Sequence, residues 1–150
     1  MITDEILKAV KKLSLGKADF HQLPCEDAEP LYYDLLNLFV SGGDRRWWWE
    51  SFSKPSESVH FTNGKGFEII TEIVPNKNEP VWFIAEEDQL PFYPIFECTP
   101  ELIQKIIGEC YSFEYYIIPK SKEWLLCETH HDFIVGIGES VTKKLVKYTA

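Results

Sequence analysis

The sequence predicts a single α+β domain over residues 1–150, in which N-terminal helices precede a largely antiparallel sheet of five or six strands with interspersed helices. The pattern of apolar residues is helical in the first third of the chain, whereas short apolar segments bounded by turn residues dominate the remainder. The length suits one domain, and 45% apolar residues suffice for its core. An α/β sandwich with some parallel pairing is the alternative, because a helix is predicted between two extended segments.

Three helices are predicted in the N-terminal part. Thr3 is expected to cap the first helix, and Gly16 is expected to end it. The second helix is expected over residues 28–40, where leucines recur at helical spacing before a serine and two glycines. Asp44 is expected to cap a short third helix that runs to Phe52.

Strand signals begin after this helical part. Short apolar or β-branched segments are expected to be extended at 58–61, 81–85, 95–98, 113–118, 124–128 and 133–137. The last three are separated by turns and predict a meander, and two of them are apolar on both faces, which indicates cover on both sides of the sheet. Residues 67–74 fit a helix or a strand. Thr99-Pro100 starts a further helix, and a final helix is expected from Ser140.

The charge balance is acidic, with 15 Lys and Arg against 24 Asp and Glu and a formal net charge of −9. Phosphate backbones and anionic membranes would be repelled on average, so a basic protein is expected as partner rather than nucleic acid or membrane. No apolar stretch approaches the length of about 20 residues that spans a bilayer. The four cysteines lack Cys-x-x-Cys spacing. We therefore expect a cytoplasmic protein without disulfides or a cofactor.

Three consecutive tryptophans, Trp47, Trp48 and Trp49, follow Arg46. On a helix, three successive side chains spread over about 200° of the circumference, so one core-facing stripe would not bury all of them. Tryptophan and arginine are typical of the residues that dominate binding energy at protein interfaces. The cluster therefore indicates either a protein-binding surface or a short helix wedged between other elements of the core.

The turn Glu128-Thr129-His130-His131-Asp132 contains four potential metal ligands, and Glu128, His130 and His131 are the candidates for a metal, ligand or catalytic site. Adjacent histidines on an extended chain point in opposite directions, and no His-Glu-x-x-His motif is present. A polar hairpin turn without ligand is therefore the alternative interpretation.

Two weaker candidates are Glu86-Glu87-Asp88 and Gly136-Ile137-Gly138. The acidic run could bind a hard cation, although a solvated loop explains it equally well. The glycines could form a phosphate-binding turn, but they lack the third glycine of that motif, and close packing of an aromatic side chain over the strand explains them better. No nucleophile elbow and no basic aromatic patch is present in the sequence.

A Leu-Pro loop, an aromatic-rich helix and a glycine pair follow one another in the N-terminal part: Leu23-Pro24, Tyr32 or Tyr33, Leu35, Leu36, Phe39 and Ser41-Gly42-Gly43. This order resembles the opening of the SUKH superfamily. The resemblance implies an α+β fold with helices beside a mostly antiparallel sheet, and a role like that of immunity proteins, which neutralise bacterial toxins by binding them. Residues 75–88 and 113–139 are also similar to a small group of bacterial proteins that has no assigned activity.

Two functions follow as hypotheses. The first is a non-enzymatic protein-binding domain of immunity, antitoxin or regulatory type, whose partner is a toxin or another basic protein and whose surface includes Arg46 and the tryptophans. The alternative is a small metal-dependent hydrolase or ligand-binding domain centred on the turn from Glu128 to Asp132.

Overall fold

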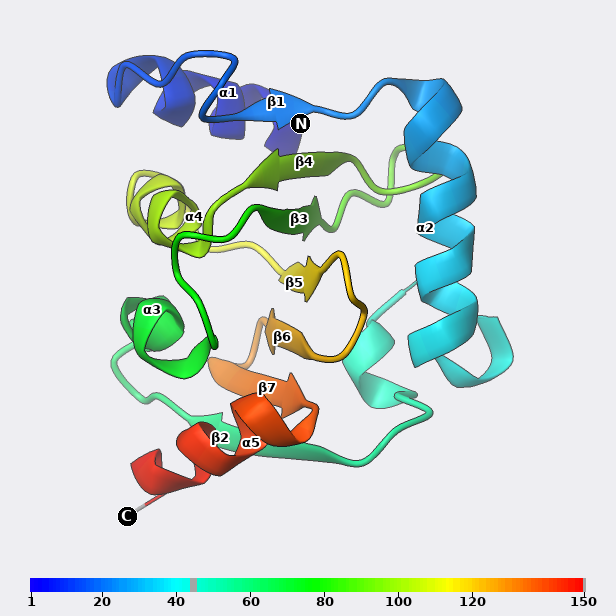
Figure 1. The fold of residues 1–150 in the computed structure, drawn as a ribbon, viewed down its shortest axis with the longest axis vertical. Helices are drawn as coiled ribbons and strands as arrows, with labels where there is room; N and C mark the ends of the chain where they lie inside the picture. Colours follow the sequence, from blue (N-terminus) through cyan, green and yellow to red (C-terminus); the bar gives the residue numbers. More distant parts are fainter. Residues whose placement is uncertain (44–45, 150) are drawn as a thin grey trace.

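The computed structural model describes residues 1–43 and 46–149, and in this part of the chain one seven-stranded sheet carries helices on both faces (Figure 1). The strands follow the order β1-β4-β3-β5-β6-β7-β2. All their pairings are antiparallel, so the parallel pairing of the alternative prediction does not occur among the described residues. The strands are β1 His21–Gln22, β2 Ser56–His60, β3 Val81–Ala85, β4 Ile95–Cys98, β5 Tyr115–Pro119, β6 Leu125–Glu128 and β7 Phe133–Ile137.

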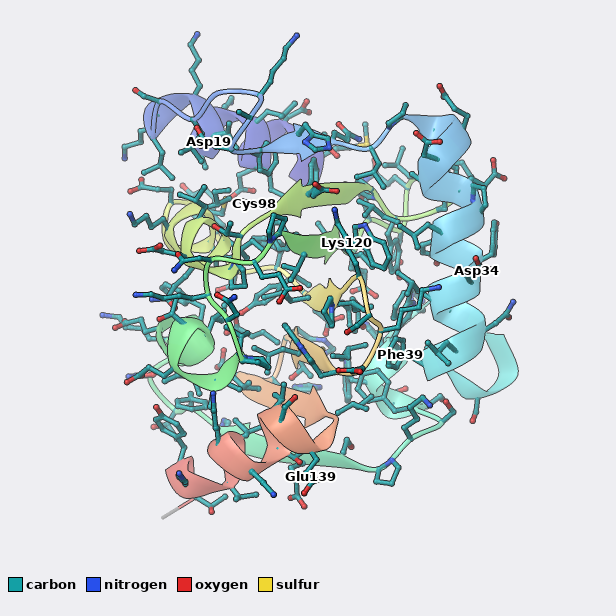
Figure 2. The ribbon with its side chains drawn as sticks, viewed as in Figure 1. Asp19, Asp34, Phe39, Cys98, Lys120 and Glu139 are labelled. Atoms are coloured by element: carbon teal, nitrogen blue, oxygen red, sulfur yellow. The ribbon has the colours of Figure 1, made fainter. Side chains whose placement is uncertain are left out.

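The helices divide unequally between the two faces of the sheet. The α-helices are α1 Ile2–Lys12, α2 Cys25–Phe39, α3 Ile70–Ile73, α4 Pro100–Gly108 and α5 Glu139–Leu145, and short 3-10 turns cover Ser41–Gly43, Trp48–Glu50, Gly66–Ile69 and Val146–Tyr148. Helix α2 lies on one face, and α1, α3, α4 and α5 lie on the other (Figure 1). Phe39, near the end of α2, points from the helix toward the sheet (Figure 2).

Strand β5 shows how the sequence builds a core on each face. Tyr115 and Ile117 belong to the core under α1, α3, α4 and α5, whereas Tyr116 and Ile118 belong to the core under α2. Successive strand residues point to opposite faces, and every residue of this strand is buried. The prediction of cover on both sides of the meander is therefore confirmed.

Several boundaries differ from the sequence prediction. Thr3 is inside α1 and does not cap it, because the helix already begins at Ile2 and Met1 occupies the cap. Residues 67–73 are helical, in a 3-10 turn followed by α3, and Val74 is extended. The sheet has more strands than expected because the additional strand, β1, contains only two residues and is too short for an alternating pattern.

The predicted third helix over 44–52 does not form in its described part. Trp47 has a left-handed backbone conformation, with φ 51°, and only Trp48–Glu50 makes a 3-10 turn. Asp44, the expected cap, lies outside the described residues. The prediction of a helix was wrong here because long-range contacts determine the backbone conformation of this segment.

Candidate functional site

The tryptophans lie on a loop that leaves α2 and returns to it. The backbone N–H of Ser41 donates to the carbonyl of Ser51 over 2.7 Å, and Val40 and Phe52 form an isolated antiparallel bridge. This closure at the base of the loop holds the tryptophan segment against the sheet, on the same face as α2.

Trp48 is a core residue and does not contribute to a surface. Its side chain is 0% exposed and stacks on Tyr116, with 4.6 Å between ring centroids. Its backbone N–H donates to the Tyr116 hydroxyl over 3.1 Å, and its ring also contacts those of Tyr32 and Tyr93. The prediction that Trp48 belongs to a binding surface is therefore corrected: the wedge interpretation describes this residue.

Trp47 and Trp49 remain partly exposed on either side of the buried ring. The Arg46 guanidinium lies 5.3 Å from the centroid of the Trp47 ring, and it also pairs with Asp88 over 3.6 Å. Trp47 contacts the His130 ring at a centroid distance of 5.6 Å. The geometry is suited to a cation–π contact with Arg46.

The two predicted candidate clusters meet in space. Trp49 packs edge-on against both His130 and His131, with centroid distances of 5.7 and 5.8 Å. The two histidine rings lie 3.9 Å apart. We call the patch formed by Arg46, Trp47, Trp49, His130 and His131 the tryptophan–histidine surface.

A buried carboxylate, Glu114, holds the rings of this surface in position through hydrogen bonds. Its Oε1 atom accepts hydrogen bonds from the Trp49 indole Nε1 over 3.1 Å and from the His130 backbone N–H over 2.9 Å. The His130 ring nitrogen Nδ1 lies 2.5 Å from the same oxygen. Glu114 is only 5% exposed, so this acceptor works in a poorly solvated environment, where its hydrogen bonds are strong.

Glu86 is the second carboxyl group beneath the surface. Its Oε1 atom accepts from the Trp47 backbone N–H over 3.1 Å and from the Tyr93 hydroxyl over 2.9 Å. Burial and the hydrogen bond with Glu114 raise the pKa of Glu86 to about 8. Two interacting carboxyl groups of like charge ionise in sequence, so near neutral pH Glu86 keeps its proton.

Glu114 is the ionised member of this pair. Burial alone would raise its pKa, but the hydrogen bonds from Glu86, His130 and Trp49 outweigh burial and lower the pKa of Glu114. Its second oxygen, Oε2, is buried and accepts no hydrogen bond from an N–H or hydroxyl group among the described residues. The arrangement is chemically a carboxylic acid–carboxylate pair that orients indole and imidazole groups.

The structure brings together only part of the predicted set: Glu128 and His130 line one small hollow of about 80 Å³, whereas His131 does not. Glu128 stands opposite Tyr115 and Ile134, in the core that faces away from α2, whereas His131 contacts Trp49. Burial raises the pKa of Glu128 to about 7. Within residues 1–43 and 46–149, no group of three or more His, Cys, Asp or Glu side chains is arranged to hold a metal.

A hollow of about 270 Å³ adjoins the tryptophan–histidine surface. Its lining combines aromatic walls with small hydroxyl side chains: Trp49, Ser56, Ser58, Thr129, His131, Phe133 and Val135. The Phe133 ring of this lining also stacks on His60, at a centroid distance of 4.7 Å. The lining is suited to an apolar or aromatic group with a few polar atoms.

The acidic run after β3 is neither a cation site nor a simple solvated loop. Its carboxylates diverge: Glu86 contacts Trp47, Glu87 accepts from the backbone N–H of Ile2 over 3.0 Å, and Asp88 pairs with Arg46. The run therefore contacts three different parts of the chain: the tryptophan segment, the start of α1 and Arg46.

The two glycines at the end of β7, Gly136 within the strand and Gly138 after it, serve packing. A Cβ atom on Gly136 would lie 3.0 Å from Val141, so aliphatic side chains of α5 rather than an aromatic ring require this glycine. Gly138, with φ 97°, lies against the backbone of Glu123 and Trp124 and not against an aromatic ring: a Cβ atom there would be 2.5 Å from the Glu123 carbonyl oxygen.

Sequence reasoning missed Glu86 and Glu114 as a pair. One signal was available: Glu114 begins an otherwise apolar segment, and a carboxylate in a buried strand needs partners. The partners themselves come from the residue that follows β3 and from two loops, which no local pattern connects.

Comparison with protein families covers nearly the whole chain. Residues 1–149 match the model described as "Family of unknown function (DUF6756)". This finding agrees with the similarity to a group without assigned activity and gives the SUKH resemblance no support. No curated protein matches the sequence. In the described part of the chain, none of the helices combines the length and apolar character that a bilayer crossing requires.

Proposed function

We propose that this chain, which belongs to the DUF6756 family, is a non-enzymatic protein-binding domain whose contact region is the tryptophan–histidine surface. The observation that carries this proposal is the anchoring of partly exposed indole and imidazole rings by the buried Glu114 carboxylate. A catalytic role for the carboxyl pair has less support, because neither Glu86 nor Glu114 lines any of the hollows described in this structure.

The composition of the surface supports binding. Tryptophan and arginine are enriched among the residues that dominate interface energy, and histidine adds hydrogen-bonding capacity at the rim. Glu114 and Glu86 hold the Trp49 ring and the Trp47 backbone in place before a partner arrives. Such preorganisation reduces the conformational entropy that is lost on binding, so more of the contact energy becomes affinity.

The partner that this proposal implies is a basic protein, as for an immunity, antitoxin or regulatory domain. The net charge of −9 would attract such a protein over long distances and would accelerate its association at low salt. The aromatic rings then supply the short-range energy. The two contributions separate experimentally, because salt screens the first far more than the second.

Affinity capture with tagged protein from the source lysate, at low and high salt, tests the proposal. One stoichiometric partner is expected, and Trp49→Ala or Trp47→Ala is expected to weaken its binding about tenfold or more. Tyr111→Ala is the control, because Tyr111 is an aromatic residue 86% exposed after α4 that is not part of the tryptophan–histidine surface. Unchanged capture by both tryptophan variants would rule out this surface as the binding region.

A ligand-binding domain is the second candidate, favoured by the hollow of about 270 Å³ beside Thr129 and His131. The hydrolase version requires a metal, and the test is metal analysis of the purified protein together with a His130→Ala, His131→Ala double variant. Less than about a tenth of an equivalent of metal would rule out the metal-dependent hydrolase. Binding of a small apolar molecule that is lost in Ser58→Trp, which fills the hollow, would favour the ligand version.

A further inference from the structure

Strand β2 is an edge of the sheet with an exposed outer side. It is last in the strand order, and β7 is its neighbour. Four of its five residues are exposed, and Val59 alone is buried. An exposed edge strand offers unpaired backbone groups to any other extended chain.

The register identifies which backbone groups face outward. Phe61 N–H donates to the carbonyl of Asp132 over 2.9 Å, next to the pair His60 and Phe133. The carbonyl of Phe133 accepts from Thr129 and therefore points toward β6, away from β2. Because hydrogen-bonded and non-hydrogen-bonded pairs alternate along antiparallel strands, Ser56, Ser58 and His60 direct their N–H and C=O groups to the free edge.

Two hollows flank this edge. One, of about 270 Å³, contains Ser56 and Ser58 and has aromatic walls of Trp49 and Phe133. The other, of about 430 Å³, lies at the start of β2, and its lining includes Ser56 and Glu57 together with the beginning of α5. Side chains of an added strand would alternate between the two faces of the sheet, so they would enter the two hollows in turn.

The larger hollow is acidic. Glu57, Glu123 and Glu139 line it together with one basic residue, Lys54. Glu139 stands at the start of α5, where Figure 2 shows it pointing outward, and it pairs with Lys143 over 2.7 Å. Glu57 and Glu123 are exposed and make no ion pair among the described residues. Lysine or arginine side chains therefore fit this hollow, whereas apolar ones fit the other.

We propose that the partner adds an extended segment to β2 as a further strand, with basic side chains toward Glu57 and Glu123 and apolar or aromatic side chains toward Trp49 and Phe133. This inference deepens the proposed function and depends on it. Backbone hydrogen bonds at Ser56, Ser58 and His60 provide the affinity, and the two hollows provide the sequence preference.

The test uses the full chain and synthetic peptides with alternating lysine and phenylalanine, observed by amide chemical shifts in NMR. Binding is expected to shift the amides of β2, and a peptide of the same composition with its lysines and phenylalanines in separate blocks is expected to bind at least about tenfold more weakly. Two N-methylated peptides, blocked at odd or at even positions, separate the contribution of the backbone. One of them is expected to lose binding and the other to retain it, because alternate N–H groups face β2.

On the protein side, Ser58→Pro removes an outward N–H and leaves the bonds to β7 in place, whereas Ser58→Thr keeps the N–H. Ser58→Pro is expected to weaken peptide binding at least about tenfold, and Ser58→Thr is expected to bind like the wild type. The N-methylated peptides keep the test valid if Ser58→Pro does not fold. Equal binding by both N-methylated peptides, or amide shifts away from β2, would overturn the inference.

Two further results distinguish this inference from the proposed function. Loss of the natural partner in Trp49→Ala together with normal binding in Ser58→Pro would leave the proposed function intact and reject strand addition. A concentration-dependent dimer of the protein, seen by sedimentation and abolished by Ser58→Pro, would identify a second copy of the chain as the occupant of the edge and would also reject the inference.

Discussion

The indole Nε1 of Trp49 donates a 3.1 Å hydrogen bond to Glu114, a residue 65 positions further along the chain. This bond connects the loop after α2 to the segment that leads into β5. Its acceptor oxygen also receives the backbone N–H of His130, so one atom sets the positions of two rings on the surface.

Glu114→Ala is expected to destabilise the domain by about 3–5 kcal/mol, because it leaves buried donors from Trp49 and His130 without an acceptor. Urea unfolding followed by tryptophan fluorescence measures this change. Glu79→Ala is the control, since Glu79 is an exposed loop residue whose side chain makes no ion pair among the described residues, and it is expected to stay within about 0.5 kcal/mol of the wild type. An equal effect of both variants would contradict the role of Glu114.

The raised pKa of Glu86 predicts a specific pH dependence. The folded state holds the Glu86 proton up to a pKa of about 8, whereas the unfolded chain releases it near the ordinary pKa of 4.5. The contribution of Glu86 is therefore fully present below the unfolded value, and stability falls as pH rises between these limits. At lower pH the protonation of Glu114, whose pKa is lowered in the folded state, acts in the opposite direction and reduces stability.

Glu86→Gln tests that trend, because glutamine mimics the protonated carboxyl group and cannot ionise. We expect the variant to gain about 1–3 kcal/mol over the wild type at pH 8 and to lose this advantage near pH 5. Denaturant unfolding at both pH values measures the difference. A wild type and a variant with parallel pH profiles would show that Glu86 does not hold a proton in the folded state.

Trp48→Ala is expected to cost about 3–5 kcal/mol of stability, because it leaves a cavity between the rings of Tyr116 and Tyr93. Trp47→Ala is expected to cost markedly less, since that ring is partly solvated. Thermal unfolding of the two variants gives the comparison. The reverse order would place Trp47 in the core and would contradict the surface that we propose.

Gly138→Ala is expected to destabilise the domain by about 2–4 kcal/mol. A Cβ atom there would lie 2.5 Å from the carbonyl oxygen of Glu123, and the φ of 97° is unfavourable for a side chain. Gly16→Ala is the matched control, because its nearest neighbour would be 3.9 Å from the new Cβ. A change below about 0.5 kcal/mol is expected for the control, and denaturant unfolding measures both.

The sequence predicted those elements whose signals are local. Thr99 caps α4 through its hydroxyl, with Pro100 in the first turn, and β7 has the predicted bounds because its apolar run is bounded by turn residues. Two-residue β1 was missed because its existence depends on pairing with β4. The α+β class followed from such local signals, whereas the strand order depends on contacts between distant segments.

The candidate site could be predicted only in part, for the same reason. The tryptophans and the histidines were each identified as candidates from the sequence, but the contact between the two clusters was not predicted. Trp47 adopts a left-handed backbone because its N–H reaches Glu86, 39 positions away. The Glu86–Glu114 pair forms because β3 and β5 are neighbours, so that the Glu86 N–H donates to the Glu114 carbonyl over 3.0 Å.

The pairing of β2 with β7 has a consequence for biosynthesis. Residues 56–60 leave the ribosome well before their pairing partners at 133–137, so this edge of the sheet is completed only when most of the chain has been translated. Until then, the nascent chain holds β2 without a neighbour on either side. A cotranslational chaperone or an early-binding partner would therefore encounter β2 as an open strand, and truncation before residue 133 would leave it permanently in that state.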